Sequence, residues 1–169
     1  YLFSTVGCVA IVSALAVVDS RITGSGRVVI RDVIVSVAPI LYVTGVKWLV
    51  ERPRPITSVG SGLLPGDPSF PSGHTAAAVI VSVMMILIVR NFARSRFPDG
   101  EDDERANRRR VFLRRAIIGA VALVVAVACS RLLLGLHYPT DVIISATICP
   151  LISYAVWCVW NACESAEEW

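Results

Sequence analysis

The sequence predicts an all-α membrane protein, a polytopic helix bundle with about five spanning helices. Of the 169 residues, 55% are hydrophobic, and the mean hydropathy is +0.68, both above a typical soluble domain. The apolar residues form long runs without the two-residue alternation of barrel strands, so only helices can cross a bilayer here. Most charges gather elsewhere, since residues 90–115 hold nine of the 16 basic residues.

Five apolar runs are long enough to be spanning helices. A hydrocarbon core of roughly 30 Å needs about 20 helical residues. The first three runs are near the short end of the usual range, so we expect little tilt or side chains that reach to the interface. The predicted spans, within a single membrane domain over residues 1–169, are residues 2–18, 33–51, 74–90, 112–133 and 142–160.

Three connecting segments separate these runs. Residues 20–27 and 52–73 are rich in glycine or proline, and we expect loops there. The charged stretch 90–115 has the mixed core DGEDDERANRRR, for which we expect a solvated loop that does not pack. The net charge of +3 comes from this stretch, so it does not indicate a nucleic-acid partner.

The arginine distribution predicts the orientation of the chain in the membrane. Five spans place the 20–32 and 90–115 connections on one side, and that side carries most of the arginines. The positive-inside rule then puts that side in the cytoplasm and the 52–73 loop outside. The cations on the predicted outer side are only Lys47, Arg52, Arg54 and Arg131.

Three polar groups lie at span ends on this predicted outer side. Lys47 and Arg54 follow the second span and are seven residues apart, so they would share one face of a helix. The third span opens on PSGH, residues 71–74, and the fourth is followed by the stretch 130–141. Because all three groups lie on one side, we expect them to meet at one membrane face. The last stretch contributes Ser130, Arg131, His137 and Asp141.

The basic residues of these groups are suited to binding a phosphate. Lys47, Arg54 and Arg131 supply three positive charges, and the two guanidinium groups match phosphate oxygens. Ser72 and Gly73 stand at a helix start, where free N–H groups and the helix dipole favour an anion. Together they provide more positive charge than a single carboxylate needs, which indicates a phosphate site.

The two histidines of the chain add catalytic chemistry to this anion site. One imidazole can attack phosphorus as a nucleophile, and the other can protonate the leaving oxygen. Asp141 lies four residues after His137 and could accept its imidazole N–H, which would fix the tautomer. No second carboxylate is near enough in the sequence to suggest a metal site. We therefore expect no metal and no cofactor, with lysine and arginine stabilising the charge.

Each polar group alone has a simpler explanation. Lys47 and Arg54 could be anchors that reach from a span end to the interface. The PSGH segment could be a helix start capped by Ser72, and the pair His137 and Asp141 carries little weight alone. Together the groups favour function, because ionisable residues are costly in a bilayer and would otherwise have gathered on one side by accident.

The three groups together resemble the signature of the type-2 phosphatidic acid phosphatase superfamily, K-x6-R-P, P-S-G-H and S-R-x5-H-x3-D. Every fixed position and every spacing of this motif matches between residues 47 and 141. Integral members of the superfamily usually carry six spans. The resemblance therefore implies a further span, which would precede Tyr1 or be replaced by something shorter.

The resemblance implies dephosphorylation without a metal, through a phosphohistidine intermediate. His137 would be the nucleophile, Asp141 would orient it, and His74 would be the general acid. The phosphoryl group would be bound by Lys47, Arg54, Ser72, Gly73 and Arg131, with Pro55, Pro71 and Ser130 in support.

Integral members of this family act on lipid phosphates and pyrophosphates, which implies a lipid phosphate substrate and membrane lipids as partners. We favour a polyprenyl carrier, as its pyrophosphate or a phosphorylated sugar-linked form, because the small chain shows no soluble domain to select a large head group. Phosphatidylglycerol phosphate or phosphatidic acid is the alternative substrate. A non-catalytic anion-binding membrane protein is the other alternative, although it would need neither histidine nor Asp141.

The same resemblance leaves the head group and the oligomeric state open. The loop 56–69 is the expected gate of the site. Within this loop, Asp67 either contributes to the site or is a solvated turn residue, and we favour the second interpretation.

Overall fold

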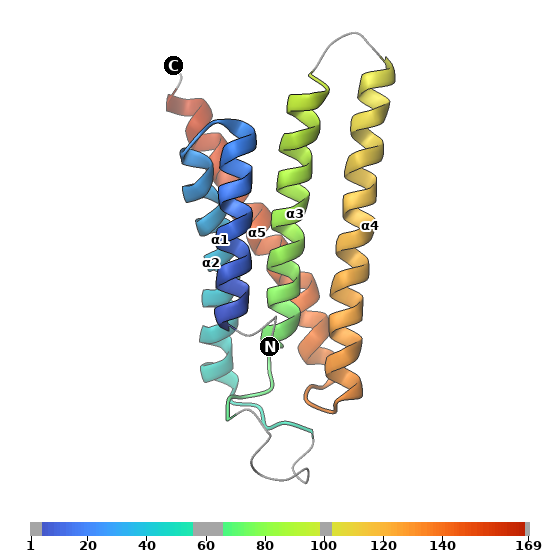
Figure 1. Cartoon of the computed structure of the whole chain (residues 1–169). Helices are drawn as coiled ribbons and strands as arrows, with labels where there is room; N and C mark the ends of the chain where they lie inside the picture. Colours follow the sequence, from blue (N-terminus) through green and yellow to red (C-terminus); the bar gives the residue numbers. More distant parts are fainter. Residues whose placement is uncertain (1–4, 56–65, 99–102, 168–169) are drawn as a thin grey trace.

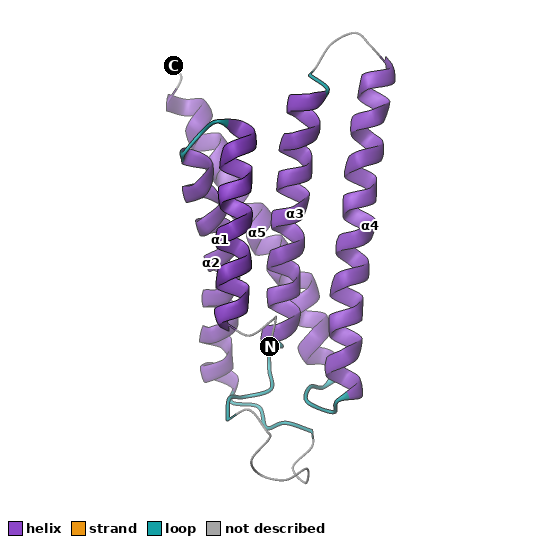
Figure 2. Cartoon of the chain, viewed as in Figure 1, coloured by secondary structure: helices purple, strands orange, loops and turns teal. Residues whose placement is uncertain are grey.

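The computed structural model describes residues 5–55, 66–98 and 103–167, and these residues form a bundle of helices (Figure 1). No strand is found within these ranges (Figure 2). Four of the helices, α2 to α5, are long and apolar enough to cross a membrane. The predicted all-α membrane bundle is therefore confirmed. The helices are α1 (Thr5–Thr23), α2 (Arg27–Val50), α3 (Gly73–Arg96), α4 (Asp103–Leu133) and α5 (Pro139–Glu167).

The helices extend further into the charged regions than the hydropathy pattern predicts. α3 continues to Arg96 and α4 begins at Asp103, so the prediction of a solvated loop over residues 90–115 is wrong for most of that stretch. A polar segment gains helix readily when it continues a helix that tertiary packing already stabilises. The exposed pair Glu104 and Arg108, one helical turn apart and 2.6 Å between charged atoms, supports the start of α4.

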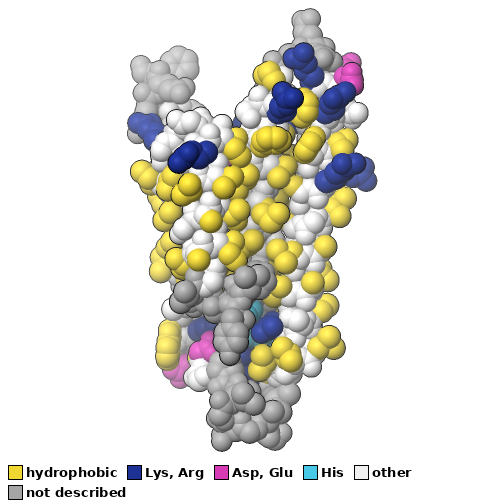
Figure 3. Space-filling view, in the orientation of Figure 1, with side chains coloured by type: hydrophobic (Ala, Val, Ile, Leu, Met, Phe, Trp, Pro, Cys, Tyr) yellow, Lys and Arg dark blue, Asp and Glu magenta, His cyan; other side chains and the backbone are white. Residues whose placement is uncertain are grey.

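α3 lies at the centre of the bundle and packs against all four other helices (Figure 1). Its segment from Thr75 to Ser82 is buried along its whole length. Three small residues in this segment, Ala76, Ala77 and Ala78, allow neighbouring helices to approach closely, as is common between membrane helices. By contrast α4 packs mainly on α3 and touches α5 little. Apolar side chains cover the middle of the visible outer surface (Figure 3), as a lipid-facing surface requires.

A buried ionic group joins three helices at the end of the bundle away from PSGH. Arg31 of α2 donates to Asp19 of α1 and to Asp32, each at 2.7 Å. Asn91 of α3 donates to both carboxylate oxygens of Asp19 at 2.9 Å. Arg31 was expected in the first loop, but α2 begins earlier and buries it. Charges inside a membrane protein are costly and are usually paired, and the pairs of this group connect α1, α2 and α3.

The opposite end of the bundle gathers the three polar groups predicted from the sequence. The end of α2, the start of α3, the end of α4 and the start of α5 all lie at this end (Figure 1). The antiparallel order of neighbouring spans therefore brings residues 47, 72 and 137 to one membrane face, as the sequence predicts.

Candidate active site

The chain turns sharply after α2, and this turn positions Arg54. Glu51 has a left-handed conformation with φ of 47°, and its N–H bonds to the Lys47 carbonyl at 3.0 Å. Lys47 and Arg54 therefore do not share a helix face, and that prediction is wrong. They converge because the segment after the turn is held by Ser69, whose N–H donates to the Arg52 carbonyl at 2.8 Å.

Asp67 bridges the two cations of the first motif group. The Lys47 ammonium lies 2.7 Å from one Asp67 carboxylate oxygen and also donates to the Pro68 carbonyl. Arg54 donates to the other carboxylate oxygen at 2.8 Å and to the Asp67 carbonyl at 3.2 Å. The interpretation of Asp67 as a solvated turn residue is therefore wrong. The rest of the predicted gate, residues 56–65, lies outside the described residues.

The charge of Asp67 is preserved by these contacts. Its partial burial acts to raise the pKa, but the hydrogen bonds and charges of Lys47 and Arg54 outweigh burial and lower the pKa below its usual value. Asp67 is thus an anion at neutral pH. Its two carboxylate oxygens bind Lys47 and Arg54, the cations that the sequence predicts to bind phosphate.

Ser72 caps α3, as the sequence predicts. Its buried hydroxyl accepts from the Thr75 N–H at 3.4 Å and from the Thr75 hydroxyl at 3.0 Å. The Ser72 N–H donates to the Asp141 carbonyl at 3.1 Å, which joins the start of α3 to the start of α5. A methyl group added at Gly73 would lie 3.9 Å from the Lys47 side chain, so the first turn of α3 lies directly beside this cation.

The His137 ring is held by one nitrogen and presents the other toward Arg54. Nδ1 lies 2.7 Å from the Ser69 carbonyl oxygen, which can only accept, so Nδ1 carries the proton. Nε2 lies 3.3 Å from Arg54 Nη1, and the same Nη1 donates to the Leu136 carbonyl at 3.0 Å. The free electron pair of Nε2 therefore faces the guanidinium that binds the anionic Asp67.

Asp141 is fully buried, and it is the more distant of the two acceptors beside His137 Nδ1. Its Oδ2 lies 3.4 Å from His137 Nδ1 and accepts the Tyr138 N–H at 2.9 Å, while the Ser69 carbonyl is closer to the ring. Its Oδ1 accepts from Arg52 at 2.9 Å. Asp141 therefore lies beside the imidazole, as expected, but its contact with Nδ1 is longer than that of the Ser69 carbonyl, because the same oxygen also accepts the Tyr138 N–H at the start of α5.

Arg52 is a site residue that the sequence did not single out. It holds Asp141, donates to the Thr140 hydroxyl at 2.7 Å, and stacks 4.0 Å from the centre of the Tyr138 ring. In the sequence, the feature that could have identified Arg52 is its position two residues before Arg54. Ser69 was missed for a different reason, because a backbone carbonyl leaves no trace in a residue pattern.

The remaining predicted residues surround this centre. His74 is the second residue of α3, is partly buried, and interacts electrostatically with Arg131 and Arg54. Arg131 lies in the last turn of α4, where its Nε donates to the Ser130 hydroxyl at 3.2 Å. Pro71 is fully buried before α3, and Pro55 is the last described residue after α2. Within the three described ranges, no group of three or more His, Cys, Asp or Glu residues is placed to hold a metal ion.

His137 is expected to stay neutral far below its usual titration range. Burial and the charge of Arg54 lower the pKa of His137 to about 4, although the Ser69 carbonyl and Asp141 act in the opposite direction. A histidine NMR titration of the His74→Gln variant, in which His137 is the one histidine left, should give a midpoint near pH 4.

The lowered pKa of His137 also determines how the stability of the folded protein changes with pH. The folded pKa lies below the unfolded value of about 6.5. The unfolded chain therefore binds the proton more readily, and stability falls as the pH drops from about 6.5 towards 4. A midpoint near 6.5 in the folded protein would show that the ring is exposed and that this geometry is wrong.

Comparison with known proteins agrees with this fold. Among solved structures, the chain is similar to one described as the crystal structure of the first transmembrane PAP2 type phosphatidylglycerolphosphate phosphatase from Bacillus subtilis, with a TM-score of 0.69. The two share 20% identity over 95% of this chain and 72% of the other, which shows a common fold. A search of curated proteins finds no match. The model of the PAP2 superfamily matches residues 27–164, a range that contains all three motif groups, and the chain therefore belongs to the PAP2 superfamily.

Proposed function

We propose that the chain is a metal-independent phosphatase that acts on a membrane lipid phosphate or pyrophosphate. The position of Arg54 carries this proposal. One of its nitrogens lies 3.3 Å from His137 Nε2, and another binds the carboxylate of Asp67 at 2.8 Å. A phosphate that takes the place of this carboxylate would bring its phosphorus next to the free electron pair of Nε2. Membership of the PAP2 superfamily supports a phosphatase activity.

The proposed reaction has two steps. His137 Nε2 attacks phosphorus, and the bond from phosphorus to the leaving oxygen breaks as His74 donates its proton to that oxygen. A phosphohistidine results. His74 then removes a proton from a water molecule, which attacks phosphorus and breaks the N–P bond. Inorganic phosphate leaves, and both histidines return to their first states.

The surrounding residues would stabilise the charge that develops in these steps. Lys47, Arg54 and Arg131 would bind the phosphoryl oxygens, together with the Ser72 hydroxyl and the N–H groups in the first turn of α3, which begins at Gly73. The imidazole becomes positive as the N–P bond forms. The Ser69 carbonyl and the Asp141 carboxylate, both close to Nδ1, would stabilise that positive charge.

The place of the site at the end of the bundle supports a lipid substrate. The motif residues lie at the ends of four apolar helices, so a lipid tail could stay in the bilayer while its phosphate enters the site. We favour a polyprenyl carrier. Phosphatidylglycerol phosphate is the second candidate, because the similar solved structure is described as a phosphatase of that lipid.

A substrate panel tests the proposal. Purified protein with a chelator present is given polyprenyl pyrophosphate, phosphatidylglycerol phosphate and phosphatidic acid, and phosphate release is measured. We expect release from at least one lipid, with the largest kcat/KM for the polyprenyl carrier. Absence of release from all three would instead favour the non-catalytic anion-binding protein.

We further propose that the site faces the extracytoplasmic side, because most arginines lie at the other end of the bundle (Figure 3). The test is Ser58→Cys in a variant without the native cysteines. An impermeant thiol reagent should label this variant in intact cells. Labelling only after lysis would place the site on the cytoplasmic face.

Asp67→Asn is expected to lower KM and to strengthen inhibition by inorganic phosphate about five- to tenfold. The Asp67 carboxylate competes with phosphate for Lys47 and Arg54, and an amide competes less because it is neutral. Steady-state kinetics with and without added phosphate measures both values. Asp103→Asn, at the other end of the bundle, is the matched control and should change neither. A KM that stays unchanged or rises in Asp67→Asn would mean that Asp67 does not compete with the substrate.

A further inference from the structure

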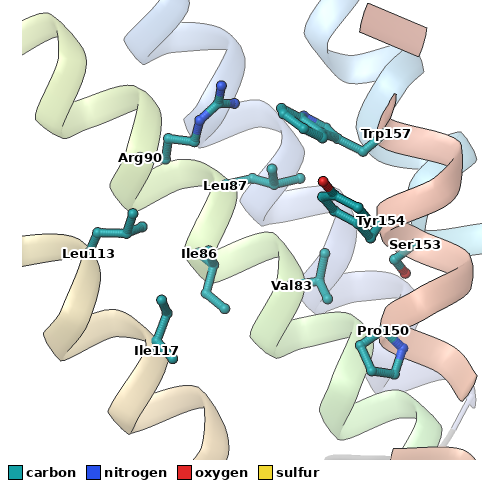
Figure 4. A pocket seen from close by; sticks show the side chains of 10 residues that line it. All are labelled: Val83, Ile86, Leu87, Arg90, Leu113, Ile117, Pro150, Ser153, Tyr154 and Trp157. Atoms are coloured by element: carbon teal, nitrogen blue, oxygen red, sulfur yellow. The ribbon is translucent and has the colours of Figure 1, made fainter. Parts of the chain in front are cut away.

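An apolar groove lies between α3, α4 and α5, away from the candidate active site (Figure 4). Its volume of about 320 Å³ is within the roughly 300–1,000 Å³ of pockets that hold small ligands. The groove forms because α4 packs on α3 and diverges from α5. Two lining residues, Ile117 and Tyr154, are 44% and 63% exposed, so the groove opens to the outer surface of the bundle.

One cation, Arg90, lies at an end of this otherwise apolar groove (Figure 4). Its guanidinium group stacks 4.6 Å from the centre of the Trp157 ring. Within the described ranges Arg90 makes no direct ion pair or hydrogen bond, and the Asp19 carboxylate acts on it only from a distance, whereas Arg31 nearby in the bundle is paired twice. Arginine keeps its charge in proteins, so an apolar groove that ends on an unpaired Arg90 is complementary to a molecule with an apolar chain and an anionic head.

The position of the groove across the membrane indicates which leaflet would supply such a molecule. At 1.5 Å per residue, Val83 lies about 15 Å and Arg90 about 26 Å along α3 from Gly73. A hydrocarbon core is roughly 30 Å thick. Arg90 therefore lies near the interface opposite the candidate active site, and the groove extends from that interface to about the middle of the bilayer. This length matches one acyl chain of a lipid in the opposite leaflet.

We propose that the groove binds one acyl chain of an anionic glycerophospholipid from the leaflet opposite the site, with the lipid phosphate on Arg90. Basic side chains gather at the α3–α4 end of the molecule (Figure 3), which attracts anionic lipid to this interface. The tail of a substrate bound at the active site starts from the other membrane face. Such a tail could approach only the inner end of the groove, and its phosphate could not reach Arg90.

Lipid retention by the purified protein tests this proposal. The protein is placed in detergent with equal amounts of phosphatidylglycerol and phosphatidylcholine of identical acyl chains, and bound lipid is measured by native mass spectrometry. We expect one retained phosphatidylglycerol per chain. Arg90→Gln should lower its retention about tenfold, because the charged hydrogen bonds to phosphate are lost. Arg96→Gln removes the same charge from another face of α3, does not line the groove, and should retain the lipid.

A second variant tests the contribution of the apolar groove separately from that of the Arg90 charge. Ile117→Trp fills the groove without changing any charge, and it should also lower phosphatidylglycerol retention about tenfold. This variant decides the question if Arg90→Gln does not fold. Equal retention of the two lipids by the parent protein, or full retention by both groove variants, would overturn the proposal. So would a raised KM for a long-tailed substrate in Ile117→Trp with unchanged lipid retention, since the groove would then hold the substrate tail.

Discussion

His137→Ala is expected to lower kcat for phosphate release at least about 10³-fold, because the variant lacks the proposed nucleophile. The ring is buried, its Nδ1 is fixed by the Ser69 carbonyl, and its Nε2 lies 3.3 Å from Arg54. Purified variant and parent are compared with the best lipid substrate of the panel. Thermal unfolding of both proteins shows whether the variant is folded.

The second histidine is the matched control for this prediction. His74→Ala removes the proposed general acid but leaves the nucleophile, so its loss of activity should depend on the leaving group. In the first step, measured as release of the alcohol or of p-nitrophenol in a single turnover, the loss should be large with a lipid alcohol and much smaller with p-nitrophenyl phosphate, whose leaving group needs no proton. His137→Ala should be equally inactive with both. Activity of His137→Ala within tenfold of the parent would rule out the phosphohistidine mechanism.

Arg54→Lys is expected to lower kcat/KM about 10²- to 10³-fold. The Arg54 guanidinium donates to Asp67 and to Leu136 and lies beside Nε2 at the same time, which a single ammonium cannot reproduce. A phosphate that is misplaced relative to Nε2 reacts more slowly even when it is bound. Steady-state kinetics measures kcat and KM separately, and we expect kcat to carry most of the loss.

Arg52→Lys is the control for Arg54→Lys, since it makes the same change two residues away. Arg52 contacts Asp141, Thr140 and the Tyr138 ring, and we expect it to act on the reaction through Asp141. We therefore expect a loss below about tenfold, given that the closer Ser69 carbonyl still holds the imidazole. Equal losses in the two variants would mean that Arg54 has no special place beside the nucleophile.

The local features of this protein could be predicted from the sequence. Runs of apolar residues indicated helices because a helix is the structure in which an isolated segment can satisfy its own backbone in lipid. The order of the spans placed the three motif groups at one end of the bundle. The start of α3 was also predictable, because the cap at Ser72 depends only on residues within one helical turn.

The helix limits were less predictable where charge and packing compete. Residues 90–96 and 103–115 are polar but continue stable spans, so they are helical rather than looped. Arg31 is buried because its charge is compensated by the adjacent Asp32 and by Asp19 of α1, which Asn91 of α3 binds in turn. Nothing in the sequence near Arg31 indicates those partners.

The sequence by itself determined the class of fold, the end of the bundle where the site lies, and the residue types that meet there. Only the tertiary structure decided which atoms face one another. Ser69 holds Nδ1 of His137 from 68 residues away, Arg52 holds Asp141 from 89 residues away, and Asp67 bridges Lys47 and Arg54. The physical reason is that spacing along a chain specifies neighbours only within a helical turn or two. Hydrogen bonds between loops depend on how the chain leaves each helix, as it does at Glu51.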